Sequence, residues 1–145
     1  MRRGLVLLRA EKWAKALAAF EQAGRSLSED PKVGYGLGIS LYYLDRLEES
    51  RRWLTKALEK LEDPYWSVAQ ATLGNIALAT GEPQEAVRRL RQAITRGALG
   101  EESYYGLGLA FVRVGRPELA RRAFAKCASP EFIRQRLRET AEAGS

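Results

Sequence analysis

Apolar residues recur along this chain at steps of three and four, the spacing of one face of an α-helix. Three breaks in the pattern put a side chain able to cap a helix directly before a proline: Asp30-Pro31, Asp63-Pro64 and Ser129-Pro130. Proline is favoured at the first position of a helix, where its missing N–H costs nothing. Two further breaks predict tight turns between helices: Gly81-Glu82-Pro83 and Gly115-Arg116-Pro117. The pattern therefore predicts an all-α chain of short, paired helices.

The predicted helices repeat. Four glycines, Gly4, Gly38, Gly74 and Gly108, are separated by 34, 36 and 34 residues. Each is followed, twelve residues later, by a small-large-small pattern: Ala16, Phe20, Ala23; Ser50, Leu54, Ala57; Ala86, Leu90, Ala93; Ala120, Phe124, Cys127. A period of this length is typical of stacked helical units. We predict one domain, 1–145, with units at about 1–30, 31–63, 64–99 and 100–128.

The repeating positions resemble the tetratricopeptide repeat, a helix-turn-helix unit of about 34 residues. The resemblance covers residues 1 to about 128 and includes the pairs Leu37-Gly38, Leu73-Gly74 and Leu107-Gly108. It departs from the family in lacking the early tryptophan, where Gly34, Gln70 and Tyr104 stand, and in having Arg3 where the other units have leucine. The resemblance implies a right-handed α-solenoid that binds a ligand along the concave groove lined by the first helices.

Residues 130–143 follow the last unit and predict one more amphipathic helix. Phe132, Ile133 and Leu137 share one side of it, while charged residues occupy the other. Stacked repeats need a terminal element with a polar outer face, so we expect a capping helix. The alternative is that this helix docks in the groove of a neighbouring molecule.

The first helices carry stripes of mostly apolar and aromatic residues that the resemblance places in the groove. We predict these groove residues: Leu5, Leu8, Tyr35, Ile39, Tyr42, Asn75, Leu78, Tyr105, Leu109 and Val112, with Tyr43 and Arg113 at the rim. An exposed apolar patch is typical of a binding surface, which favours an apolar or amphipathic peptide as the ligand. Family members that capture acidic tails use a carboxylate clamp, of which only Asn75 has a matching residue type here. The alternative is that these side chains simply pack between neighbouring first helices.

Composition argues against several kinds of chemistry. The chain has no histidine and a single cysteine, Cys127, so an internal disulfide is excluded and a metal site, a cofactor or a catalytic centre is not expected. Cys127 stands where the other units have alanine, which favours a place in the core. The glycines of Gly34-x-Gly36-x-Gly38 fit close helix packing better than a phosphate-binding loop. We therefore expect a protein that is not an enzyme and binds another protein, with a homo-oligomer as the alternative.

The net charge of +6 raises nucleic acid or an anionic surface as a further partner. Arginines recur on the predicted second helices, at Arg51-Arg52, Arg88-Arg89 and Arg121-Arg122. Glutamates three or four residues earlier favour ion pairs on a solvated face, so nucleic-acid binding is unlikely on this pattern. The apolar stretch that opens the chain ends at Arg9 and is too short for a signal peptide. We expect no membrane insertion, a cytoplasmic protein, and a first unit that begins within a helix.

Overall fold

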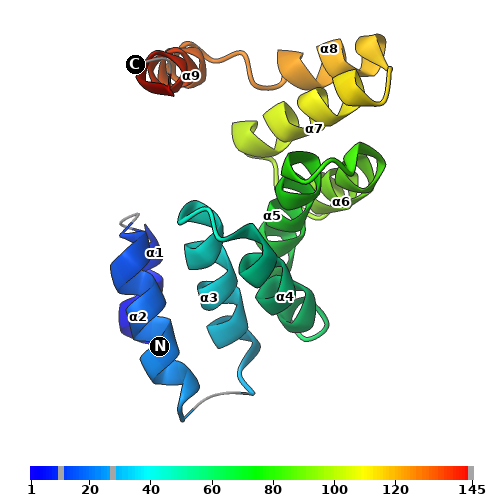
Figure 1. Ribbon diagram of the computed structural model, residues 1–145. Helices are drawn as coiled ribbons and strands as arrows, with labels where there is room; N and C mark the ends of the chain where they lie inside the picture. Colours follow the sequence, from blue (N-terminus) through cyan, green and yellow to red (C-terminus); the bar gives the residue numbers. More distant parts are fainter. Residues whose placement is uncertain (10–11, 27–28, 144–145) are drawn as a thin grey trace.

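A computed structural model of the chain describes residues 1–9, 12–26 and 29–143, and every element in these ranges is an α-helix (Figure 1). In chain order the helices are α1 (Arg2–Arg9), α2 (Trp13–Gly24), α3 (Pro31–Tyr43), α4 (Leu47–Leu58), α5 (Tyr65–Ala79), α6 (Pro83–Thr95), α7 (Glu101–Arg113), α8 (Pro117–Ala125) and α9 (Pro130–Ala143). The predicted all-α architecture is confirmed. None of the described helices is both long enough and apolar enough to span a membrane.

The helices form four consecutive pairs, α1/α2 to α7/α8, and the pairs stack. Each first helix contacts the next first helix, and each second helix contacts the first helix of the following pair. Figure 1 shows the stack as an arc with α3, α5 and α7 on its inner side and α4, α6 and α8 on its outer side. This is the α-solenoid predicted from the sequence.

Glycines of the first helices allow the two helices of a pair to approach closely. A Cβ atom on Gly38 would overlap the side chain of Leu54, and one on Gly108 would overlap Phe124. A Cβ on Gly74 would lie 2.7 Å from Leu90 Cγ. The close packing predicted for these glycines is confirmed, and it explains why the large residue of each second helix lies opposite a glycine.

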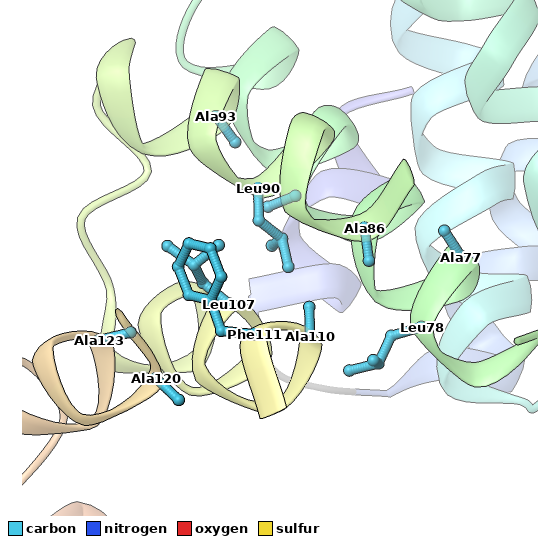
Figure 2. Packing of buried hydrophobic residues seen from close by; sticks show 11 residues of the cluster. Ala77, Leu78, Ala86, Leu90, Ala93, Leu107, Ala110, Phe111, Ala120 and Ala123 are labelled. Carbon is cyan, nitrogen blue, oxygen red and sulfur yellow. The ribbon is translucent and has the colours of Figure 1, made fainter. Parts of the chain in front are cut away.

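Buried apolar side chains form a core that runs along the stack. One cluster joins the third and fourth pairs through Leu90 of α6 and Phe111 of α7 (Figure 2). Alanines on both sides, such as Ala86 and Ala110, are completely buried in it. Small residues and large ones meet across this interface, as is typical of a closely packed protein interior.

Most of the predicted helix boundaries are confirmed by their hydrogen bonds. The Asp30 carboxylate accepts a bond from the Lys32 N–H at 2.9 Å, and the Ser129 hydroxyl accepts one from the Phe132 N–H at 3.2 Å. Gly81 and Gly115 adopt φ values of 82° and 78°, the left-handed conformation that ends a helix most easily at glycine.

The predicted cap at Asp63 is wrong. Helix α5 begins at Tyr65, so its cap residue is Pro64 rather than Asp63, and no side-chain hydrogen bond is made from that position. The Asp63 carboxylate instead accepts hydrogen bonds from the Ser67 hydroxyl at 2.8 Å and from Arg96 Nη2 at 3.0 Å. The side chain thus ties the start of α5 to the end of α6.

Helix α9 lies apart from α8 (Figure 1), and its Arg136 side chain pairs with Glu102 in the first turn of α7. Phe132 is buried, whereas Ile133 is exposed and Leu137 is 65% exposed. The predicted helix is therefore present, but only one of its three apolar side chains is covered by the rest of the described structure.

Candidate functional site

The inner face of the arc is built from the first helices α1, α3, α5 and α7. The predicted groove residues lie on these helices at steps of four and three, which places each set along one side of its helix. The structure divides them by exposure into a buried set, a partly exposed set and an exposed set.

Three of the predicted groove residues belong to the core. Tyr35, Ile39 and Leu78 are buried in the apolar clusters that join neighbouring pairs. Tyr35 packs edge-on against Tyr65, with ring centroids 5.1 Å apart. These side chains offer almost no surface to a ligand, so the predicted contact set needs correction at these positions. The sequence pattern does not distinguish these buried residues from the exposed ones, because both kinds lie along the same side of a first helix.

The remaining predicted residues keep part of their surface on the inner face. The partly exposed residues are Leu5, Leu8, Tyr42, Asn75, Tyr105 and Leu109. Tyr43 is 53% exposed, Val112 is 55% exposed, and Arg113 is also exposed. Asn75 lies close to Gly106, where its Oδ1 atom occupies the space that a Cβ would take. Most of the accessible predicted positions are therefore apolar or aromatic.

Aromatic rings gather at the end of α3. The ring of Tyr43 stacks on Trp13 of α2, with centroids 4.0 Å apart and planes inclined by 9°. Tyr42 meets Tyr43 edge-on at 5.0 Å. The sequence repeat did not single out Trp13, because it belongs to a second helix. The sequence shows only that Trp13 is the first residue of that helix.

Helix α9 contacts the inner face at the start of α7. The Arg136 guanidinium lies 4.3 Å from the ring centroid of Tyr105 and pairs with Glu102, and the Phe132 ring lies 5.7 Å from Tyr105. The Ser129 hydroxyl donates to Glu101 at 2.6 Å. Helical spacing in the sequence does not predict this link of Glu101 and Glu102 to α9.

Tyr42 brings the two sides of the arc into electrostatic contact. Burial raises the pKa of its hydroxyl from the ordinary 10.0 to about 12, and the nearby Tyr43 and the charge of Glu102 act in the same direction. The positive charge of Arg136 opposes them. The pKa of a residue of α3 is therefore affected by charges on α7 and α9, although sixty residues separate Tyr42 from Glu102 and ninety-four separate it from Arg136.

The arginines of the outer face are partly paired, as predicted. Arg88 and Arg89 both bind the Glu85 carboxylate, and for Arg89 the distance is 2.9 Å. Arg51 instead reaches Glu82 of the next pair at 2.9 Å. Some arginines thus pair with a glutamate of their own helix, and others pair with a glutamate that the stacking of helix pairs brings near.

Possible metal-binding side chains are not clustered in the described part of the chain. The described residues contain no group of three or more cysteine, aspartate and glutamate side chains placed to hold a metal ion. Cys127 is buried, and this burial raises the pKa of its thiol. A raised pKa lowers the fraction of nucleophilic thiolate.

The stacked helix pairs and the apolar inner face are typical of helical-repeat interaction proteins. A family model for the tetratricopeptide repeat matches residues 1–64 and 72–130, which is most of the chain. The chain therefore belongs to the tetratricopeptide repeat family, whose members generally serve as interaction modules.

Solved structures with the same fold include MamA and YrrB. The MamA structure superposes with a TM-score of 0.70 at 17% identity, covering 95% of this chain and 78% of that chain. YrrB, described as a TPR protein with an unusual peptide-binding site, superposes with a TM-score of 0.68 at 22% identity, covering 86% and 63%. At these identities the likeness concerns the fold. Comparison with curated proteins gave no match.

Proposed function

We propose that the chain is a non-enzymatic adaptor that binds an apolar or amphipathic segment of another protein along its inner face. The observation that carries this proposal is the exposure of apolar and aromatic side chains there, above all Tyr43 and Val112. Tyrosine suits such a surface because it buries a large area at low entropic cost and keeps a polar tip. Membership of the tetratricopeptide repeat family supports an interaction role.

The buried residues behind this face support a preorganised surface. Tyr35, Ile39 and Leu78 hold neighbouring first helices together. A rigid face loses little conformational freedom on binding, so the ordering cost falls mainly on the partner segment.

The proposal is tested by affinity capture with a double variant, Leu109→Glu/Val112→Glu, which places two charges on the inner face. The matched control is Leu99→Glu, because Leu99 is 64% exposed in the loop between α6 and α7. Circular dichroism establishes that each variant is folded. We expect a protein retained by the wild type and the control and lost from the double variant, followed by direct titration with segments of that protein. Equal retention by all three baits would contradict the proposal.

Self-association is a second candidate function, favoured by the exposed Ile133 and Leu137 of α9. An apolar strip on an amphipathic helix can enter the inner face of another copy. Light scattering over a range of protein concentrations distinguishes the two functions. A mass that rises with concentration in the wild type and not in Leu137→Glu supports assembly through α9, and a constant monomer mass opposes it.

A further inference from the structure

A groove of about 700 Å³ lies on the outer face of the arc, between α2 and α4. Its apolar lining comes from three helices: Leu17 of α2, Leu37 and Leu41 of α3, and Trp53 of α4. Trp53 is 39% exposed, so its ring is available to a ligand. None of these residues is on the inner face, so this surface is separate from the proposed adaptor site.

The groove lies at a position where the first helix pair has a glycine and the next two pairs have large apolar residues. Gly24 lines it, and the residues at the same distance from the repeat glycine in the next two pairs are Leu58 and Ile94. Both of those side chains are partly buried against the core. A Cβ on Gly24 would meet Val33 at 3.4 Å, an ordinary contact. The backbone can therefore carry a side chain here, and its absence leaves space.

The next junction on the outer face is bridged by polar side chains. Arg51 crosses from α4 to the Thr80 hydroxyl at 2.7 Å and to Glu82 at 2.9 Å. The residues in the corresponding positions one pair earlier are Leu17, Leu44 and Arg46. Leu17 has no polar group to make this bridge, and Arg46 stands where the bridge would need an acidic residue. The junction between α2 and α4 is therefore not crossed by the same polar side chains.

The charged residues around the groove give it a positive excess. They are Arg25, Arg46, Arg52 and Lys56 against Glu21 and Glu49. Arg46 pairs with Glu49 at 2.6 Å. Within the described ranges, Arg25, Arg52 and Lys56 have no carboxylate within ion-pair distance. Complementarity therefore favours a ligand with negative charges beside an apolar centre.

We propose that this groove docks an acidic segment of a partner protein, which inserts a large apolar side chain beside Trp53 and Leu17. Carboxylates flanking that side chain face Arg25, Arg52 and Lys56. Trp53 acts as the anchor, since a partly exposed tryptophan that lines a groove is a frequent hot spot. The basic rim selects the sign of the ligand charge and accelerates association.

The test uses a short blocked peptide in which glutamates flank phenylalanine and leucine, labelled for fluorescence anisotropy. A peptide with lysine in place of each glutamate is the charge control. We expect the acidic peptide to bind, to bind more weakly as salt is added, and to shift the indole N–H resonance of Trp53. The lysine peptide should show no such binding.

Two variants locate the binding. Gly24→Leu fills the groove with the side chain that the second pair carries, and Arg52→Glu reverses a rim charge. We expect each to weaken the acidic peptide by about tenfold or more. Arg122→Glu is the matched control for Arg52→Glu, because Arg122 is the corresponding exposed residue of the fourth pair. Arg122→Glu should bind as the wild type does.

Several results would overturn the docking proposal. They are no binding of the acidic peptide by the wild type, equal binding of the lysine peptide, and unchanged affinity in a Gly24→Leu protein whose thermal melt shows it folded. The inner-face double variant Leu109→Glu/Val112→Glu should bind the acidic peptide normally. The two proposals can therefore fail separately. A failed inner-face proposal does not affect binding of the acidic peptide to the outer groove, and a failed outer-groove proposal does not affect partner binding to the inner face.

Discussion

Arg113 of α7 donates a hydrogen bond from Nη1 to the backbone carbonyl oxygen of Leu78 in α5, at 2.8 Å. Helix α5 ends at Ala79, so this carbonyl is one of the last four, which have no acceptor role within their own helix. The sequence pattern predicts that Arg113 lies at the rim of a groove, which we propose as the binding surface. The structure shows that it also joins two neighbouring first helices, so a change at this residue tests stability as well as binding.

Removal of the Arg113 side chain should therefore destabilise the stack. We expect Arg113→Ala to lower the free energy of unfolding by about 1 kcal/mol, the usual contribution of one such hydrogen bond. Arg116→Ala is the control, because Arg116 is exposed and lies in the turn after α7. Chemical denaturation measures both. Equal stability of the two variants would show that the bond to Leu78 contributes nothing.

The repeat glycine of α3 should tolerate no side chain. In Gly38→Ala the added Cβ overlaps Leu54, which is completely buried. Overpacking of a core costs about 1–3 kcal/mol, more than the roughly 1 kcal/mol that alanine gains in helix propensity. We expect a net loss of up to about 2 kcal/mol in a thermal or denaturant melt.

A substitution at Gly100 provides the control for Gly38→Ala. Nothing lies within 4 Å of a Cβ at Gly100, and this residue is the cap of α7. Gly100→Ser should leave stability unchanged or raise it by a few tenths of a kcal/mol, because serine can bond to an N–H of the first turn. If both glycine variants behave alike, the close approach of α3 and α4 is not what constrains Gly38.

Stability should fall in alkaline solution because of two tyrosines. Burial raises the pKa of Tyr35 and of Tyr42 from 10.0 to about 12. Between these values the unfolded chain releases protons that the folded chain retains, so the free energy of unfolding decreases as the pH rises. Denaturant melts across this range measure the slope, and Tyr42→Phe should reduce it. A tyrosinate absorbance titration with every tyrosine ionising near 10 would contradict the prediction.

Helix α9 should be released when its contact with α7 is removed. Arg136 stacks on Tyr105 and pairs with Glu102, whereas Leu137 and Arg138 are exposed. We expect Arg136→Ala to speed amide hydrogen exchange across 130–143 with little change in the other helices. Arg138→Ala should exchange like the wild type. Unchanged protection in Arg136→Ala would show that Phe132 and Ser129 are sufficient to hold the helix.

Local patterns in the sequence predict the helices because their causes are local. The cap at Asp30 depends on an N–H two residues away, and the turns at Gly81 and Gly115 depend on the glycines themselves. The predicted cap at Asp63 is wrong because α5 begins after Pro64, and the Asp63 carboxylate also binds Arg96, thirty-three residues away. The stacking of α5 on α6 creates that contact, and no local pattern records it.

The sequence predicts which side of each first helix carries the candidate site, but it does not predict which residues on that side are exposed. Steps of four and three identify one side of α3, yet the structure buries Ile39 and leaves Tyr43 exposed on the same helix. The difference arises from how much of each side chain the neighbouring first helix covers. Trp13 and Arg136 reach the site from helices outside the stripe, so only the assembled stack brings them into view.

The contacts of Gly38 with Leu54 and of Gly108 with Phe124 also fix how near the two helices of each pair lie. A larger residue at either glycine would have to push those two helices apart or displace the buried side chain opposite it. The first helix of each pair also carries the side chains of the inner face. The shape of the proposed binding surface therefore depends on residues buried behind it.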